Sequence, residues 1–213
     1  MQGLKRTKED VVAEFRAAEI LEAACQVFAR KGFAGASVDE IAEAAGLAKA
    51  TVYNYFRSKQ ELYRKALHRG IAGLVEETRR NVEAAPTTAE KVRAFLATRI
   101  RYAEAHRDFV SVYHAEFGAV HPACLRKECK SLCRQQVQVL ADVIREGVAE
   151  GAIRSGPADA TAFLACEVTR ALISRRLRGW SRGSLEEDIE LVFDLIWKGL
   201  AVAGPGVAPC LVG

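Results

Sequence analysis

The sequence predicts an all-α protein of about nine helices. Over most of its 213 residues, apolar side chains recur every three or four positions, which is the spacing of one face of an α-helix. Strict alternation of apolar and polar residues does not persist anywhere, and the hairpin dipeptides Asn-Gly and Asp-Gly do not occur. Four helix starts are marked by a capping box, in which a Ser or Thr precedes a Glu by three residues: Ser37, Ser58, Thr87 and Ser184.

The order of the helices follows from these starts and from glycines at predicted ends. Gly32, Gly46 and Gly151 each follow a helical stretch, and glycine is the residue most easily placed just beyond a last turn. The predicted helices are residues 8–31, 38–45, 49–55, 58–84, 88–105, 108–117, 122–149, 157–177 and 184–203.

Apolar stripes at helical spacing support the long helices individually. Within residues 12–28 the stripe consists of Phe15, Ala18, Leu21, Ala24, Val27 and Phe28. Within residues 62–75 it consists of Leu62, Ala66, Leu67, Ile71, Leu74 and Val75. Within residues 185–200 it consists of Leu185, Ile189, Val192, Phe193, Ile196, Trp197 and Leu200.

The predicted helices differ in length and apolar content along the chain, which suggests two domains. Short helices precede residue 56, whereas the helices after residue 58 are long and apolar, as is typical of a bundle. We therefore expect an N-terminal domain at residues 1–57 and a second domain at residues 58–203. Residues 204–213, with two prolines and three glycines, are expected to form a frayed tail.

Composition narrows the class of protein. The net charge is +4, and the first 69 residues hold 12 basic and 9 acidic side chains, a weak indication of a nucleic-acid partner. No apolar stretch approaches the roughly 18–20 residues of a membrane span. The first residues also lack the apolar core of a secretory signal. We therefore expect no membrane partner, a cytoplasmic location and six reduced cysteines.

Motifs of catalysis are missing from the sequence. It contains no glycine-rich phosphate loop after a strand, no G-x-S-x-G elbow and no H-E-x-x-H metal motif. None of the four histidines has a recognisable nucleophile as partner. We therefore expect no enzymatic activity, no catalytic residue, no cofactor and no metal.

Residues 37–56 predict a helix-turn-helix. Ala42 is small where two helices must approach closely, and Gly46 can take the positive φ of a tight turn. Val52 is apolar where the second helix must pack back on the first. The apolar residues expected to form a small core with Leu21 and Phe28 are Ile41, Ala45, Leu47, Val52 and Phe56. A helical hairpin with another function would contain many of the same residues.

The outward face of the second short helix carries side chains suited to a major groove. Lysine donates to guanine, asparagine pairs with adenine, and small methyl groups contact thymine. The candidate base-reading residues on this face, which also carries Tyr55, are Lys49, Ala50, Thr51 and Asn54. The candidates for phosphate contacts, which fix register without reading sequence, are Ser37, Tyr53, Tyr55 and Lys59.

The segment from Arg16 to Leu67 resembles the N-terminal domain of the TetR (TetR/AcrR) family of bacterial transcriptional regulators. The resemblance is carried by the ending FARKGF of the first helix, the turn SVDEIAEAAGL and the recognition segment KATVYNYFRSK. Together these motifs are highly specific. One departure is Ala48, where many members have a serine. Its loss removes a helix cap and is expected to lower operator affinity slightly.

The resemblance implies a homodimer that binds a palindromic double-stranded DNA operator, with one recognition helix in each of two successive major grooves. It assigns base reading to Lys49, Ala50, Thr51 and Asn54. It assigns phosphate contacts to Ser37, Tyr53, Tyr55 and Lys59. It further implies a repressor that an unknown small-molecule effector releases from the operator.

In similar proteins the last two long helices form a four-helix dimer interface, and here these are residues 157–177 and 184–203. The first of them presents Ala160, Phe163, Leu164, Val168, Ala171 and Leu172. The second presents Leu185, Ile189, Val192, Ile196 and Leu200. Each is apolar over more than one face, as expected of a helix that packs on its own core and on a partner. The alternative is that the second face is also core of the same chain.

The middle helices, residues 88–149, enclose the effector in similar proteins. Their candidate lining residues combine aromatic rings with a few polar groups, and they are Arg99, Tyr102, His106, Phe109, Tyr113, His114 and Phe117. For Phe109, Tyr113 and Phe117, which are spaced by four, ordinary core packing is the alternative.

A cluster of potential metal or redox ligands suggests a competing function. Its members are His121, Cys124, Cys129 and Cys133. Cys129 and Cys133 share one helix face, so a dimeric ligand-binding or thiol-sensing protein that does not read DNA is the alternative. Against it, Cys124 is placed five residues before Cys129, which points the two side chains apart. Cysteine is also a common small core residue.

Overall fold

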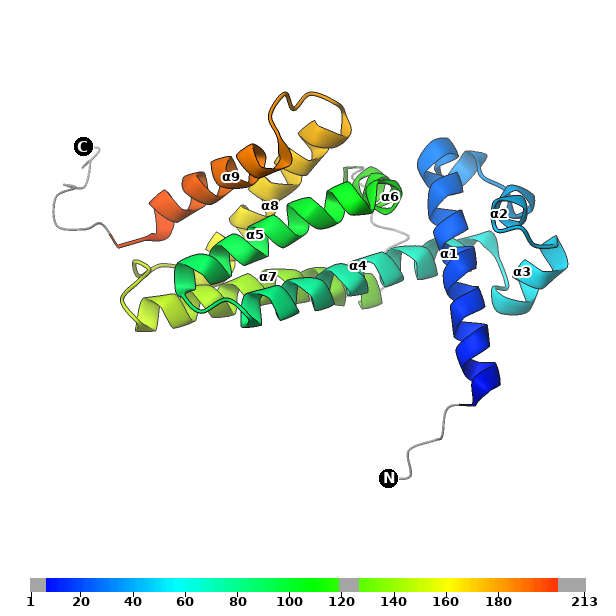
Figure 1. Ribbon diagram of the computed structural model, residues 1–213, viewed down its shortest axis with the longest axis horizontal. Coiled ribbons are helices and arrows are strands. Elements are labelled where there is room, and N and C mark those ends of the chain that lie inside the picture. The colour runs from blue at the N-terminus through cyan, green and yellow to red at the C-terminus, as the bar shows by residue number, and fades with distance from the viewer. Residues whose placement is uncertain (1–6, 119–126, 203–213) are drawn as a thin grey trace. The chain divides into compact units, whose positions relative to one another are not determined.

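Nine α-helices make up almost all of the chain that the computed structural model describes, which is residues 7–118 and 127–202, with side chains for residues 7–114 and 131–202. They are α1 (Lys8–Gly35), α2 (Val38–Ala44), α3 (Lys49–Tyr55), α4 (Lys59–Glu83), α5 (Thr88–Ala105), α6 (Arg107–Gly118), α7 (Lys127–Ala149), α8 (Ala158–Leu177) and α9 (Leu185–Leu200) (Figure 1). These residues contain no strand, only an isolated antiparallel bridge between Ile153 and Ala201. The predicted all-α class is confirmed.

The observed ends of α1 and α9 differ from the predicted ones. At Gly32 the chain takes φ +68° and ψ 172°, yet helical structure resumes and α1 continues to Gly35. At its other end the chain leaves α9 at Ala201, which is extended and pairs with Ile153. The predicted start of the seventh helix at Pro122 and the predicted tail at residues 204–213 lie outside the described residues.

The predicted capping boxes set the helix starts. In α9 the Ser184 hydroxyl accepts the Glu187 N–H at 3.2 Å, and the Glu187 carboxylate accepts the Ser184 N–H at 2.7 Å. The hydroxyls of Ser58 and Thr87 likewise accept the N–H of the glutamate three residues later. A fifth box, at Thr7 and Asp10, begins α1. Each cap satisfies backbone N–H groups that have no partner inside the helix.

The described chain divides into two compact units. The first contains α1, α2, α3, the part of α4 up to Ala72, and α6. In it, α1 packs against α2 and α6. A side chain at Gly70 would meet the ring of Phe109 at 2.2 Å, so a glycine is needed where α4 passes α6. The core of this unit includes Ile20, Ala24 and Val27, all essentially inaccessible to solvent.

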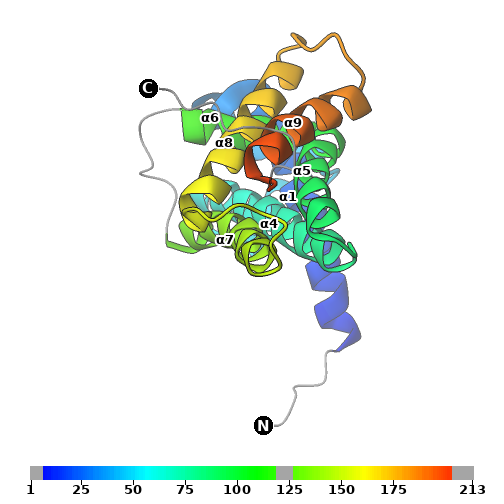
Figure 2. The ribbon, with the colours of Figure 1, turned by 90° about the vertical axis from the view of Figure 1, so that its left-hand side faces the viewer.

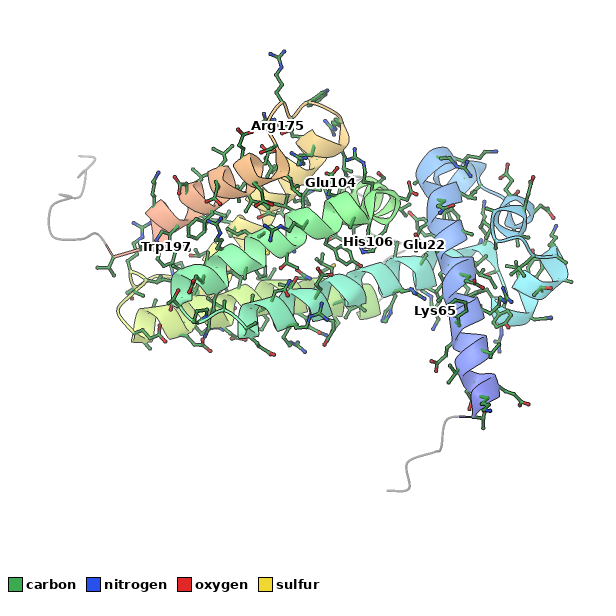
Figure 3. All side chains as sticks on the ribbon, in the orientation of Figure 1. Glu22, Lys65, Glu104, His106, Arg175 and Trp197 are labelled. Atoms are coloured by element: carbon green, nitrogen blue, oxygen red, sulfur yellow. The ribbon has the colours of Figure 1, made fainter. Side chains whose placement is uncertain are left out.

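The second unit contains α4 from Gly73, α5, α8, α9, and α7 from Ser131. Figure 2 shows α8 and α9 lying alongside α5, and all three pack on one another. Arg176 of α8 pairs with Asp188 of α9 at 2.5 Å and contacts Glu104 of α5 at 3.4 Å. Its exposed neighbour Arg175, labelled in Figure 3, donates from Nε to the Trp180 carbonyl at 3.5 Å. No helix of the described chain is long and apolar enough to cross a lipid bilayer.

Candidate nucleic-acid interface

The local sequence fixes the first helix of the predicted helix-turn-helix, α2. The Ser37 hydroxyl accepts the Glu40 N–H at 3.2 Å, and the Glu40 carboxylate accepts the Ser37 N–H at 3.0 Å. Glu40 also pairs with Lys31 of α1. These contacts hold the pKa of Glu40 below its ordinary value, the Lys31 hydrogen bond being the largest cause. The start of α2 is thereby tied to the end of α1.

The turn between α2 and α3 depends on Gly46. Its φ is +65°, which a residue with a side chain rarely adopts. The Leu47 N–H donates to the Ala42 carbonyl at 2.9 Å and the Gly46 N–H to the Glu43 carbonyl at 3.0 Å, which closes the end of α2. A Cβ at Gly46 would meet no atom within 4 Å, so backbone conformation and not space requires the glycine.

The inner face of α3 packs as the sequence predicts. Val52 and Ile41 are fully buried, and Phe56 is 6% exposed. Leu21 and Phe28 of α1 are buried too, whereas Ala45 and Leu47 are only half-buried. Because α3 is two turns long, burial of Val52 determines which of its side chains face outward.

The outward face of α3 carries the predicted base-reading residues. Lys49, Ala50, Tyr53 and Asn54 are exposed, while Thr51 and Tyr55 are half-buried. The structure therefore brings these six residues together on two helical turns. Their contacts with bases or phosphates remain predictions.

Lys49 is already engaged by a carboxylate on α2. Its ammonium donates to Asp39 Oδ2 at 2.8 Å, and both side chains are about half exposed or more. The hydrogen bond from Lys49 to Asp39 raises the pKa of Lys49 above its ordinary value. The sequence analysis missed Asp39, because ten residues across a turn give no spacing signal. Reading a base with Lys49 requires this pair to open.

Lys59 is bound by the chain itself. Its ammonium donates to the carbonyls of Phe33 and Ala36, each at 2.8 Å, and lies 4.6 Å from the centre of the Phe33 ring. The Phe33 ring in turn lies 5.0 Å from that of Tyr63, and Tyr63 lies 4.9 Å from Phe28. Lys59 and these rings join the first turn of α4 to the end of α1. Its predicted phosphate contact therefore competes with these carbonyls.

The hydroxyl of Ser37 is also already engaged within the chain. It accepts the Glu40 N–H and also lies 3.1 Å from the Glu40 carboxylate, as donor. The side chain is half-buried. Of the predicted phosphate-contacting residues, Tyr53 is the one whose side chain is exposed.

The predicted effector-binding residues fall in both units. Arg99 and Tyr102 are buried on α5, in the second unit. In the first unit, His106 is exposed, Phe109 is buried, and Tyr113 and His114 are half-buried. The ring centres of Phe109 and Tyr113 lie 6.0 Å apart, and those of Tyr113 and His114 lie 5.9 Å apart. The side chain of Phe117 lies outside the described residues.

The predicted dimer helices expose apolar faces. On α8 the exposed residues are Ala160, Phe163, Leu164, Val168 and Ala171, whereas Leu172 is buried. On α9 the stripe named from the sequence points inward, with Ile189, Val192 and Leu200 buried. The outward apolar residues of α9 are Leu191 and Leu195, which are 54% and 63% exposed.

The proposed metal or redox cluster lies mostly outside the described residues. His121 and Cys124 fall there, Cys129 lies on α7 without a described side chain, and only the side chain of Cys133, which is half-buried, is described. Among the residues that the structure describes, no group of three His, Cys, Asp or Glu side chains is placed to hold a metal ion. Two other thiols are buried: burial raises the pKa of Cys25 to about 12 and also raises that of Cys166.

Two family models match the chain. Residues 20–66 match the model of bacterial regulatory proteins of the tetR family. Residues 85–173 match the model of the tetracyclin repressor-like C-terminal domain. The first match spans α2 and α3 with most of α1, and the second extends from just before α5 into α8.

Individual similar proteins belong to the same class as these family models. The HTH-type transcriptional repressor KstR2 of Mycobacterium tuberculosis is 26% identical over 139 residues, which is 65% of this chain and 70% of KstR2. The solved structure of the regulator PfmR from Thermus thermophilus is 28% identical, with a TM-score of 0.71 over 84% of this chain and 97% of PfmR.

A third similar protein has a ligand in its solved structure. The transcriptional regulator FadR from Bacillus subtilis, in complex with stearoyl-CoA, is 19% identical, with a TM-score of 0.76 over 85% of this chain and 98% of FadR. At this identity the likeness shows the fold alone. With an N-terminal and a C-terminal model of one family matched in order, and α3 exposing the polar face described above, the chain belongs to the TetR family of bacterial regulatory proteins.

Proposed function

We propose that the chain is a ligand-responsive repressor that binds a palindromic double-stranded DNA operator as a homodimer and leaves it when a small molecule binds. The observation that carries this proposal is α3, whose inner face is fixed by Val52 and whose outer face is polar and exposed. A helix held in this way can enter a major groove with its polar face toward the bases.

The exposed residues of α3 divide into two roles. Lys49 and Asn54 carry donors suited to guanine and adenine edges, and the methyl groups of Ala50 and Thr51 suit thymine. Tyr53 and Tyr55 reach phosphates from the same helix, and Ser37 and Lys59 flank it. The competition at Lys59 and Ser37 makes Tyr53 the strongest candidate for a phosphate contact.

Dimerisation is proposed to use the exposed apolar faces of α8 and α9. Phe163 and Leu164 are 53% and 62% exposed, and Leu195 on α9 is 63% exposed. Large side chains exposed together on neighbouring helices mark a protein contact more often than a solvated surface. A second copy would cover them with the same face, as twofold symmetry requires.

The effector is proposed to have a long apolar body. This follows from the relatives, because FadR of Bacillus subtilis was solved with stearoyl-CoA, and KstR2 is described as a ketosteroid transcriptional regulator. A ligand removes the protein from DNA only if it binds the DNA-incompetent form of the dimer more tightly than the competent one. The effector must therefore discriminate between two separations of the recognition helices.

Selection of bound fragments from a random DNA duplex pool tests the proposal. We expect an inverted repeat whose half-sites are centred about 10–10.5 base pairs apart, or a multiple of this spacing. Asn54→Ala should relax the preference at one position of each half-site by about 1–3 kcal/mol. Gln138→Ala, an exposed amide on α7, is the matched control and should leave the selected sequence unchanged.

Two results would contradict the proposal. A pool without an enriched inverted repeat would favour the alternative, a dimeric ligand-binding protein that does not read DNA. An enriched site that Asn54→Ala and Gln138→Ala change equally would show that α3 is not the reading helix.

A further inference from the structure

Two buried side chains in the second unit each have one donor group without a hydrogen-bond acceptor. They are Arg99 of α5, which is 9% exposed, and Gln136 of α7, which is 4% exposed. Arg99 Nη1 donates to Gln136 Oε1 at 2.6 Å. This bond orients the glutamine amide, because its oxygen must face the guanidinium.

In this pair, the two nitrogen groups that have no hydrogen-bond partner are both donors. Arg99 Nε and Gln136 Nε2 are buried, and neither has a hydrogen-bond partner. Turning the glutamine amide would not help, since it would place an NH₂ group against the guanidinium. A buried donor without an acceptor is costly, and a buried cation more so. The missing partner must therefore carry acceptor oxygens.

No ion pair joins Arg99 to a carboxylate whose side chain the structure describes. Each one on α5, α7 and α8 bonds elsewhere, Glu90 to Thr87, Glu104 to Arg176, Asp142 and Asp159 to Arg145, Glu146 to Lys91, and Glu167 to Arg170. Within the described part of the chain, Arg99 thus has no counter-ion.

The thiol of Cys166, which lies near Arg99, does not act as its counter-ion. Burial raises the pKa of Cys166 on α8 above its ordinary value, although the charge of Arg99 opposes that shift. The thiol is therefore neutral near pH 7. Arg99 also lies 5.6 Å from the centre of the Phe95 ring, which offers a quadrupole but no acceptor oxygen.

Most side chains one turn from Arg99 on α5 are apolar, although Tyr102 carries a hydroxyl. Phe95 and Leu96 are fully buried, and Ile100 is 1% exposed. A guanidinium in such surroundings suits a ligand with one charged end and an apolar body, because the body replaces apolar contacts while the end supplies oxygens. Alcohols and ketones accept hydrogen bonds but leave the charge uncompensated.

We infer that Arg99 and Gln136 hold the head of the effector, a carboxylate on an apolar chain. The inference rests on the proposed ligand response and adds the chemical class of the ligand and the residues that select it. Arg99 donates from Nε, and Gln136 donates from Nε2, to the oxygens of that head.

Calorimetric titration of the full chain without DNA tests the inference directly. The probes are decanoate and the neutral 1-decanol, which has the same chain length. Wild type should bind decanoate about tenfold or more tightly than decanol.

Variants at the pair and on the same helix make the test specific. Arg99→Gln should bind decanoate no more tightly than decanol. Arg101→Gln, which removes an exposed arginine from the same helix, should keep the wild-type preference. The inference is overturned if wild type binds decanol as tightly as decanoate, if decanoate does not bind, or if Arg99→Gln keeps the preference.

A second measurement does not depend on the choice of probe. The double variant Arg99→Met/Gln136→Leu removes both donors and keeps the side-chain volume close to that of wild type. If the donors lack partners in the ligand-free chain, its melting temperature should equal or exceed that of wild type. A fall of more than about 2 °C would mean that ordered water or the protein satisfies the pair, and would overturn the inference.

These results separate this inference from the proposed function. A chain that prefers decanoate through Arg99 but selects no operator loses the repressor proposal and keeps the site. A chain that selects an operator but shows no preference for decanoate keeps the repressor proposal and loses the site.

Discussion

Two lysines near α3 differ in what they can offer to DNA. Lys49 is exposed and paired with one exposed carboxylate, so a phosphate or a base edge can replace that partner at little cost. Lys59 donates to two backbone carbonyls at 2.8 Å, and releasing it would leave those carbonyls without a donor. Residue type alone cannot distinguish these situations, which is why the sequence analysis treated both lysines as DNA contacts.

Asp39 should weaken operator binding. Asp39→Asn removes a negative charge beside the DNA face and frees Lys49, so affinity should rise about three- to tenfold at low salt. The salt dependence should steepen by about one counterion, because Lys49 no longer exchanges one anion for another. Fluorescence anisotropy at several salt concentrations measures both effects. Glu43→Gln, the same charge change at an exposed site on α2, is the control, and an equal gain there would refute the role of the pair.

Lys59 should contribute mainly to stability. Lys59→Met keeps the apolar stem but removes the bonds to the carbonyls of Phe33 and Ala36, at a cost of about 1–3 kcal/mol. Chemical denaturation measures this cost, and the salt dependence of operator binding should stay the same. If binding instead loses about one counterion of salt dependence, Lys59 reaches a phosphate in the complex.

At the scale of elements, the helices were predictable because their signals are local. Capping boxes, apolar spacing and the glycine at residue 46 lie within a few residues of the feature they determine. The outward face of α9 was not predictable in the same way. Its helix is apolar on more than one side, and only packing against α5 and α8 shows that Ile189 is buried and Leu195 exposed.

In the candidate site, too, local sequence predicted some features and not others. The outward residues of α3 follow from helical periodicity and from one buried valine, Val52. The partners of those residues do not, because the contacts of Lys49 and Lys59 join segments separated by a turn or by a whole helix. The unsatisfied pair of Arg99 and Gln136 also joins two helices, and no sequence spacing indicates it.

Asp188 connects α9 to α8 and should make stability depend on acid. Burial acts to raise the pKa of Asp188, but hydrogen bonds from Ser181 and Arg176 outweigh it and hold the pKa below its ordinary value. A lowered pKa in the folded state adds stability above about pH 4, the ordinary range of an aspartate. That stability is lost as the pH falls further through the folded-state pKa.

The test is Asp188→Asn, which should cost about 3 kcal/mol at pH 7 because it leaves Arg176 without its nearest counter-ion. The variant should also lose less stability than wild type between pH 5 and pH 2 or so, as measured by urea denaturation. Asp194→Asn breaks an exposed pair with Lys198 and should cost less than about 0.5 kcal/mol. Equal costs for the two variants would contradict a special role for Asp188.

At the scale of the whole molecule, the exposed apolar residues of α8 and α9 form the proposed dimer contact. Leu195→Glu places a charge in the proposed dimer contact and should weaken self-association about a hundredfold or more. Sedimentation equilibrium measures this change, and operator affinity should fall with it, because a monomer offers a single recognition helix. Val12→Glu, at a similarly exposed valine on α1, should leave self-association unchanged. A Leu195→Glu chain that remains dimeric would exclude this face.

The recognition helix begins without a side-chain cap, at Ala48. A two-turn helix is too short to be stable by itself in water, so α3 persists through the anchoring of Val52 and, at its first turn, through the exposed pair of Lys49 and Asp39. The backbone amides of Lys49 and Ala50 should therefore exchange with deuterium well before those of α5 or α9. The helix proposed to enter the groove is thus ready to adjust its backbone at its first turn, and Ala48→Ser would exchange some of that adaptability for order.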